Sequence, residues 1–293
     1  MIGKKKILIF GENGQVGREL QKTCVLLGEI VVVGSKEANF CEPDRLSEVL
    51  LREKPDVIIN AAAYTAVDKA ESEPELAMQI NGIAVGAIAR IAKEIGALLI
   101  HYSTDYVFDG RKELPYVETD EVCPINVYGK TKRCGEEEII SSGCAYFIFR
   151  ISWIYSEEDS SFSSKMLNLG QKNEVLQVVS DQIGAPTWAR TVAEVTAQIL
   201  RQSKAYQQEN QGIFHLCAAG VGSWYEFARE ILKDLAVEVV PIPSAEYPTP
   251  AQRPKNSQLC CDKIRESFAV DLPDWREAYQ RMIANPANMM NFL

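Results

Sequence analysis

The sequence predicts an α/β protein: a Rossmann-type doubly wound parallel sheet with a smaller C-terminal domain. Two observations support this fold class. Short apolar runs alternate with helical patterns from Ile7 to Arg150, as is typical of a parallel sheet with right-handed crossovers. Beyond Tyr155 the alternation loosens, and prolines gather between Pro241 and Pro254, which indicates a second, smaller unit.

The first strand is expected at Ile7–Phe10, and a glycine-rich turn and a helical pattern follow it. The turn, Gly11–Gly17, reads GENGQVG. Strand, glycine turn and helix in this order are the context that a dinucleotide fingerprint requires. Gly14 lets backbone approach a pyrophosphate, and the helix N-terminus at Gln15 and Val16 presents its positive dipole end to the phosphates.

The second strand, expected at Ile30–Val33, bears on the choice of cofactor. An NAD-specific site normally has an Asp or Glu at the end of this strand, where it binds the 2′-hydroxyl of the adenosine ribose. Here Gly34–Lys36 follows instead, and its serine and lysine are available to a 2′-phosphate. We therefore expect NADPH as the cofactor, with NADH also accepted. Asn39 and Phe40 are expected to flank the adenine.

The rest of the sheet follows the same alternation. The expected elements are a helix from Pro43 to Leu51, a strand at Asp56–Ile59, a helix from Glu75 to Glu94, and strands at Ala97–Tyr102 and Cys144–Arg150. Small residues at Ala61–Ala63 follow the third strand, as a sheet needs where a cofactor crosses the carboxyl ends of its strands. Hydroxyl groups at Ser103 and Thr104 end the fourth strand, where they are placed to hydrogen-bond a substrate carbonyl.

The later elements divide between two domains. Helical patterns at 191–200 and 223–235 and a strand at 213–216 indicate a return to the first sheet. We therefore expect an NAD(P)-binding domain of residues 1–155 and 188–235. Residues 156–187 and 236–293 are expected to form the substrate-binding domain.

Tyr128 and Lys132 are the strongest candidates for chemistry. They lie four residues apart in a stretch with a helical pattern, so both side chains are expected on one helix face. A phenol with its ordinary pKa of about 10 is a poor proton donor at neutral pH. The Lys132 ammonium is expected to lower that pKa by roughly 1–3 units and so to make Tyr128 a better acid. Because Tyr and Lys are common, this spacing counts only together with the glycine turn.

Composition limits the partners. The net charge of −9 argues against nucleic acid or an anionic membrane surface, because both need a basic face. Two histidines, and eight cysteines without a C-x-x-C pair, suggest no metal-ligand set, so we expect no metal. No apolar run approaches the roughly 20 residues of a membrane span, and the first is too short for a signal peptide. We expect a cytoplasmic protein with reduced thiols.

Six further motifs follow the glycine turn in a fixed order. They are Asn60–Glu71 (NAAAYTAVDKAE), His101–Phe108 (HYSTDYVF), Asn126–Lys132 (NVYGKTK), Arg150–Trp153 (RISW), Asp181–Thr187 (DQIGAPT) and Tyr247–Pro254 (YPTPAQRP). In number and order these motifs resemble the extended short-chain dehydrogenase/reductases, and the resemblance covers nearly the whole chain. It implies NAD(P)H-dependent reduction of the C4 ketone of dTDP-4-dehydro-L-rhamnose (dTDP-6-deoxy-L-lyxo-4-hexulose) to dTDP-L-rhamnose, the last step of dTDP-rhamnose biosynthesis.

The resemblance also implies roles for single residues. Tyr128 is similar to the proton donor, Lys132 to the lysine that holds the nicotinamide ribose, and Thr104 to the hydroxyl that polarises the carbonyl. The fingerprint and the resemblance together place the cofactor against Gly11, Gly14, Gln15, Val16, Asn39, Phe40, Ala63, Tyr64, Thr65, Tyr102, Tyr128 and Lys132. The nucleotide sugar is expected against Thr104, Asp105, Trp153 and Arg253, with the planar donor fork of Arg253 on a phosphate.

The residues leave two alternatives. One is another nucleotide-sugar reductase or an epimerase of the same superfamily, which shares Tyr128, Lys132 and the glycine turn. The other is an NADP-binding regulatory subunit similar to that of methionine adenosyltransferase. A homodimer is also expected from the resemblance.

Overall fold

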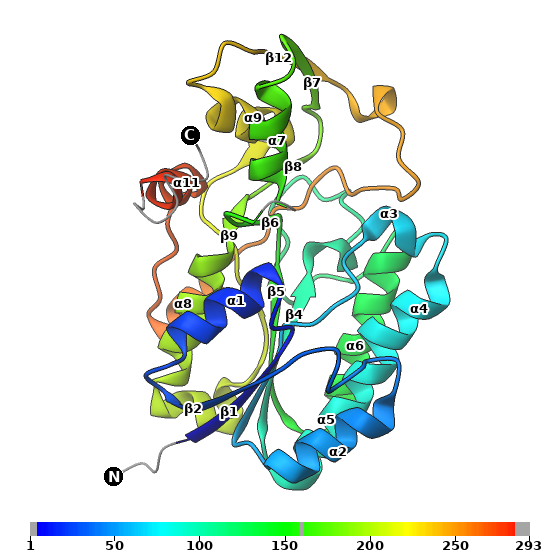
Figure 1. Cartoon of the computed structure of the whole chain (residues 1–293), viewed down its shortest axis with the longest axis vertical. Helices are drawn as coiled ribbons and strands as arrows, with labels where there is room; N and C mark the ends of the chain where they lie inside the picture. Colours follow the sequence, from blue (N-terminus) through cyan, green and yellow to red (C-terminus); the bar gives the residue numbers. More distant parts are fainter. Residues whose placement is uncertain (1–4, 159–160, 285–293) are drawn as a thin grey trace.

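The computed structural model of the chain describes residues 5–158 and 161–284. A six-stranded sheet forms its larger part, with strand order β2-β1-β3-β4-β5-β10 and every neighbouring pair parallel (Figure 1). The strands are β1 (Lys5–Phe10), β2 (Gly28–Val33), β3 (Val57–Asn60), β4 (Leu98–Thr104), β5 (Ala145–Ile151) and β10 (Gly212–His215). The order reverses at β1, so the carboxyl ends of β1 and β3 form the switch point at which α/β sheets bind ligands.

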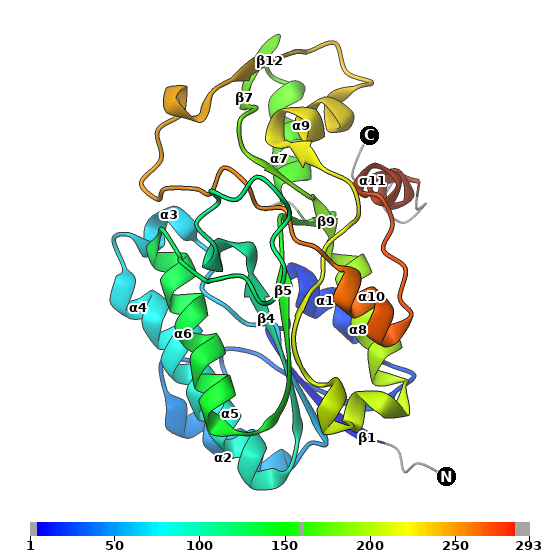
Figure 2. The same cartoon turned by 180° about the vertical axis from the view of Figure 1, so that it is seen from behind.

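Helices cover both faces of the sheet. On one face lie α1 (Gln15–Thr23) and α8 (Ala189–Leu200); on the other lie α2 (Pro43–Glu53), α5 (Ala84–Ile95) and α6 (Val127–Ser142) (Figures 1 and 2). Each face has its own cluster of buried apolar side chains. Strand β4 is buried along its whole length, as expected for a strand covered on both sides. The predicted doubly wound sheet is confirmed.

Helix α6 is positioned by its ends. The Asn126 side chain caps its N-terminus by accepting a hydrogen bond from the Gly129 N–H at 2.8 Å. Its amide nitrogen also donates to the Gln252 carbonyl at 2.8 Å. At the other end, Gly143 adopts φ +67°, the left-handed conformation that ends many helices. The cap therefore ties the start of α6 to the proline-rich segment, which is far away in the sequence.

The helix expected from Glu75 to Glu94 is interrupted. The structure has α4 (Pro74–Met78), a π-helical turn at Gln79–Ile83, and then α5. In the π turn, the buried Asn81 side chain accepts the Tyr64 N–H at 2.9 Å and donates to the Tyr64 carbonyl and the Thr131 hydroxyl, each at 3.1 Å. These bonds satisfy a buried amide, so the widened turn accompanies contacts that Asn81 makes with residues 17 and 50 positions away.

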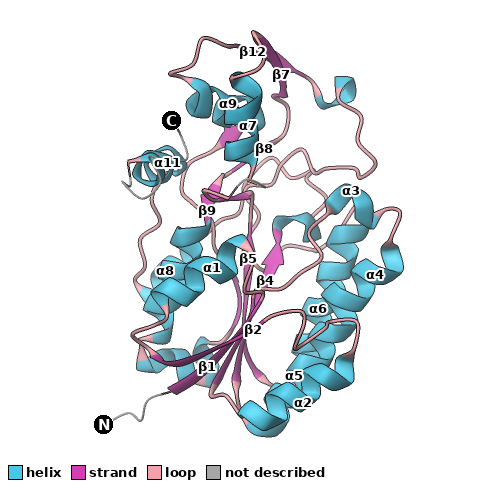
Figure 3. Cartoon of the chain, viewed as in Figure 1, coloured by secondary structure: helices cyan, strands magenta, loops and turns pink. Residues whose placement is uncertain are grey.

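The smaller part of the structure lies above the carboxyl ends of the sheet (Figure 3). In it, β7 (Val175–Val179) pairs in parallel with β12 (Glu238–Ile242), and α7 (Phe162–Gly170), α9 (Trp224–Leu232) and α11 (Trp275–Ile283) share a third apolar cluster. The short elements are α3 (Val67–Ala70), η2 (Asp105–Val107), β6 (Ile154–Tyr155), β8 (Ile183–Gly184), β9 (Thr187–Trp188), η3 (Ser203–Tyr206), η4 (Gln208–Asn210), β11 (Gly222–Ser223), η5 (Ser244–Glu246) and α10 (Asp262–Phe268).

The segments that pack with the large sheet differ from those that the sequence predicted. Helix α8 and strand β10 pack with the large sheet, whereas α9, which falls in the same predicted segment 188–235, packs against α7, β7 and β12. Helix α10 lies beyond that segment and packs against β10. The division into two domains itself stays a prediction. Over the ranges 5–158 and 161–284, no helix combines the length and the apolar character that crossing a membrane requires.

Candidate active site

A cleft of about 970 Å³ opens above the switch point. The glycine turn, the ends of β2 to β5, the start of α6, and side chains of α7 and α9 line it. Nearly all the predicted site residues meet there: Gly11, Gly14, Gln15, Val16, Asn39, Phe40, Ala63, Thr65, Tyr102, Thr104, Asp105, Tyr128, Lys132, Trp153 and Arg253. Tyr64 is not among the lining residues, because its hydroxyl turns away and donates to Glu73 at 2.7 Å.

The glycine turn forms the floor of the cleft at the switch point. Gly11 adopts φ +90°, and a Cβ atom there would lie 2.6 Å from the backbone carbon of Ala61, so only glycine fits between β1 and β3. Gly14 is the N-cap of α1 and offers no side chain to its first turn, which leaves the N–H groups of that turn facing the cleft. This uncapped helix N-terminus fits the pyrophosphate of a dinucleotide.

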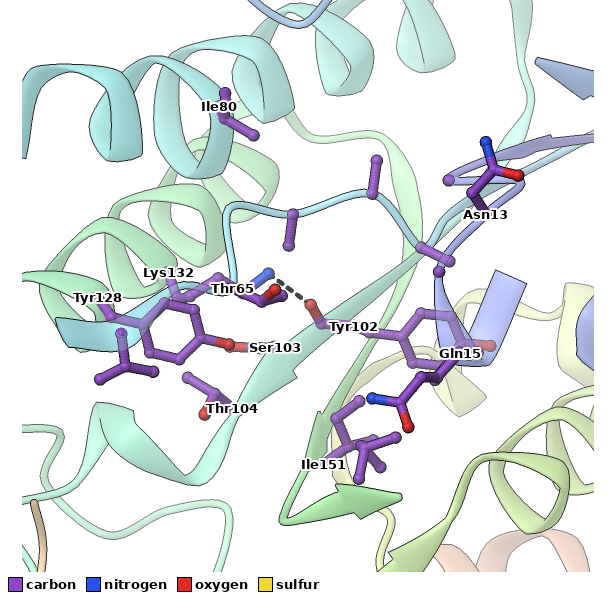
Figure 4. A pocket seen from close by; sticks show the side chains of 18 of the residues that line it. Asn13, Gln15, Thr65, Ile80, Tyr102, Ser103, Thr104, Tyr128, Lys132 and Ile151 are labelled. Carbon is purple, nitrogen blue, oxygen red and sulfur yellow. Dashed lines mark hydrogen bonds between the residues drawn. The ribbon is translucent and has the colours of Figure 1, made fainter. Parts of the chain in front are cut away.

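Tyr128 and Lys132 lie on the same face of α6, as predicted, but do not bond to each other. The Lys132 ammonium group donates to the Tyr102 carbonyl at 2.6 Å, a bond drawn dashed in Figure 4. Its nitrogen also lies 3.1 Å from Nε2 of His101, whose Nδ1 in turn contacts the Asn60 amide at 3.1 Å. His101 and Lys132 are both buried, so this group of polar residues lies beneath the cleft rather than in solvent.

The predicted effect of Lys132 on the acidity of Tyr128 is wrong in this structure. Burial, reinforced by the Asp105 carboxylate, raises the pKa of Tyr128 above its ordinary value, and a hydrogen bond with Thr104 offsets part of that rise. Burial also lowers the pKa of Lys132 to about 7, so the lysine loses much of its positive charge near neutral pH. Desolvation is therefore the largest cause of the pKa shift of both groups.

Thr104 and Asp105 form the wall beside Tyr128. The Thr104 hydroxyl donates to the Asp105 carboxylate at 3.0 Å and accepts the Tyr106 N–H at 3.1 Å. Burial raises the pKa of Asp105 to about 6, although hydrogen bonds from Ser257 and Thr104 oppose the rise. The wall thus brings two hydroxyl groups and a carboxyl group together within a largely desolvated site.

Two aromatic rings also line the cleft. The rings of Trp153 and Trp224 stack with centroids 3.7 Å apart and planes 8° apart. Trp153 adopts φ +47°, an uncommon conformation for a residue with a side chain, and this turn after β5 directs its indole into the cleft. Trp153 therefore lines the cleft, as a contact with the nucleotide sugar would require.

Arg253 reaches the cleft from the proline-rich segment. Its guanidinium forms a two-pronged ion pair with the Asp68 carboxylate, with nitrogen–oxygen distances of 3.0 and 2.8 Å. The two residues are 185 positions apart, and the sequence did not predict that they pair. The guanidinium beside it lowers the pKa of Asp68 below its usual value.

Several lining residues were not predicted. They include Glu12, Asn13, Lys165 and Trp224. Glu12 and Asn13 lie inside the glycine turn, so the fingerprint itself was the signal for them. Trp224 and Lys165 belong to helices of the smaller part, and their place in the cleft follows from tertiary packing that no local pattern encodes. Among the described residues, no three His, Cys, Asp or Glu side chains gather as a metal site requires.

The switch-point cleft, the glycine turn and the tyrosine–lysine helix define a nicotinamide-dinucleotide-binding protein of the short-chain dehydrogenase/reductase class. The family model described as "RmlD substrate binding domain" matches residues 5–288. The chain belongs to this family.

Known relatives agree along nearly the whole chain. It is 44% identical to a dTDP-4-dehydrorhamnose reductase from Burkholderia thailandensis over 286 residues, covering 93% of this chain and 96% of the relative. With the Escherichia coli enzyme of the same name the identity is 42% over 289 residues, covering 94% and 96%. The crystal structure of dTDP-4-dehydrorhamnose reductase from Bacillus anthracis in complex with NADP superposes with a TM-score of 0.90 at 33% identity, covering 96% of this chain and 99% of that one.

Proposed function

We propose that this chain reduces the C4 ketone of dTDP-4-dehydro-L-rhamnose to dTDP-L-rhamnose with NADPH, the last step of dTDP-rhamnose biosynthesis. The observation that carries the proposal is the identity of 42–44% to curated reductases of that name over more than nine-tenths of the chain. The cleft supports it independently, because its paired hydroxyl groups and uncapped helix N-terminus suit a ketone and a pyrophosphate.

The glycine turn and its neighbours would hold the cofactor. Gly14, Gln15 and Val16 are proposed to bind the pyrophosphate at the N-terminus of α1, and Ala63 and Thr65 to lie against the rest of the dinucleotide. NADPH, when bound, supplies the hydride that reduces the carbonyl carbon.

Tyr128 is proposed to protonate the oxygen of the reduced carbonyl. Its raised pKa keeps the phenol protonated at neutral pH, so the proton is present when it is needed. An alkoxide is a stronger base than a phenolate, and the transfer therefore remains favourable. Thr104 is proposed to donate a hydrogen bond to the same oxygen, the electrostatic contribution that is usually the largest in such sites.

Lys132 and Asp105 are proposed to position these groups. Lys132 is fixed by the Tyr102 carbonyl and His101, and from there it would hold the nicotinamide ribose. Asp105 accepts the one proton of the Thr104 hydroxyl in this structure, and that proton would turn from the carboxylate to the substrate oxygen when the ketone binds. For the nucleotide sugar, Trp153 would contact the sugar ring, and Arg253 would exchange part of its bonding with Asp68 for a phosphate.

The test is turnover with the proposed substrate. Purified protein mixed with NADPH and dTDP-4-dehydro-L-rhamnose should oxidise one NADPH for each dTDP-L-rhamnose formed. An epimerase would keep its cofactor through the cycle, and a regulatory subunit would bind NADP without turnover. A product formed without NADPH oxidation, or no product at all, would contradict the proposal.

Two further proposals concern the state of the protein. We propose a cytoplasmic location, which the eight free cysteines support. A homodimer is proposed from the family resemblance alone, and light scattering of the purified protein would test it.

A further inference from the structure

The end of β2 carries a carboxylate from another part of the chain. Gly34 lies twenty positions after Gly14, where a dinucleotide site normally has the acid that binds the adenosine ribose. A Cβ atom built on Gly34 would collide with Oε1 of Glu12 and lie 2.6 Å from its Cδ. The Glu12 carboxylate therefore lies directly against the Gly34 backbone. The end of β2 therefore has a carboxylate beside it, although the sequence has no acid at that position.

Glu12 also faces the cleft rather than the outer surface. Glu12, Gly34, Ser35 and Asn39 all line it. The Asn13 amide donates to Oε1 of Glu12 at 3.2 Å and helps to direct the carboxylate. Arg18, a cation close to Glu12 in the sequence, forms its ion pair with Glu158 at 3.4 Å rather than with Glu12.

We propose that Glu12 sets the relative affinity for NADH and NADPH, a role that rests on the proposed dinucleotide-dependent function. Its carboxylate, held over Gly34, accepts a hydrogen bond from the 2′-hydroxyl of NADH. The same carboxylate repels the 2′-phosphate of NADPH, which carries close to two negative charges at neutral pH. Ser35 and the absence of an acid at the end of β2 favour NADPH. Glu12 limits this preference, so both cofactors are accepted.

Glu12→Gln tests this proposal, because it removes the charge and keeps the shape of the side chain. The affinities for NADP⁺ and NAD⁺ are measured by titration calorimetry, which needs no turnover. We expect the ratio of the two affinities to shift about tenfold toward NADP⁺, the size of one charge–charge interaction at a partly solvated site. Glu12→Ala should shift it in the same direction, so the conclusion does not depend on one variant folding well.

The matched control is Glu37→Gln. Glu37 is an exposed acid three positions after Gly34 that pairs with Arg52 and does not line the cleft. Its variant should leave the affinity ratio unchanged. An unchanged ratio in both folded Glu12 variants would overturn the proposal. If the wild type does not turn over the ketosugar nucleotide, the proposed function is contradicted. The ratio of the NADP⁺ and NAD⁺ affinities would still test the role of Glu12.

Discussion

Replacing Lys132 with methionine should change how stability depends on pH. Lys132 is only 1% exposed, and burial lowers the pKa of its ammonium group from 10.5 to about 7. Between these two values the unfolded chain holds a proton that the native protein has released. The free energy of unfolding of the wild type therefore rises with pH throughout this window.

The size of the effect follows from the shift in pKa. Between about pH 7.5 and about pH 9.5, the titration of Lys132 should add roughly 2–3 kcal/mol to the unfolding free energy of the wild type. Lys132→Met lacks this contribution. It also removes the contacts of the lysine with the Tyr102 carbonyl and with Nε2 of His101, which costs about 1–3 kcal/mol per buried group but does not vary with pH over this window.

The assay is urea denaturation of both proteins at the two pH values. For each protein the change in the free energy of unfolding between the two pH values is compared. The cost of the lost hydrogen bonds and the titration of the other groups cancel in this difference. Lys130→Met is the matched control, because Lys130 lies on the same helix but is exposed, and its variant should follow the wild type. Equal pH dependence in the wild type and Lys132→Met would refute the reasoning and show that the lysine stays charged when buried.

Three further outcomes are expected. Tyr128→Phe should lower turnover by at least ~10²-fold while NADPH affinity, measured by calorimetry, stays close to wild type; near-normal turnover would remove Tyr128 from the mechanism. Thr104→Val should lower kcat by about 10²–10³-fold in the NADPH-oxidation assay, whereas Thr104→Ser, which keeps the hydroxyl, should retain most of it. Gly11→Ala should destabilise the protein by more than about 2 kcal/mol, because the new Cβ meets the Ala61 backbone; Gly96→Ala, also at positive φ but in open space, should cost only about 1 kcal/mol in denaturant titrations.

The sequence predicted the elements of the sheet well, because buried parallel strands are short apolar runs bounded by turns and this pattern is local. Most of the residues that it predicted for the site line one cleft, since the carboxyl ends of parallel strands meet at one edge of the sheet. Three features were not predictable in this way. The π turn depends on contacts of Asn81 with a distant loop, and the pKa of Tyr128 depends on burial. The pair of Asp68 and Arg253 joins segments 185 positions apart.

The stacked indoles of Trp153 and Trp224 give the protein an optical signal of its own. Two transition dipoles this close couple as an exciton, and the strong indole transition then gives paired bands of opposite sign in the far-ultraviolet circular dichroism. One ring follows β5 of the large sheet, and the other begins α9 of the smaller part. The splitting therefore reports the contact between these two parts of the structure. A change in this ring contact when a nucleotide sugar binds can thus be measured without a label, as a change in the amplitude of the paired bands.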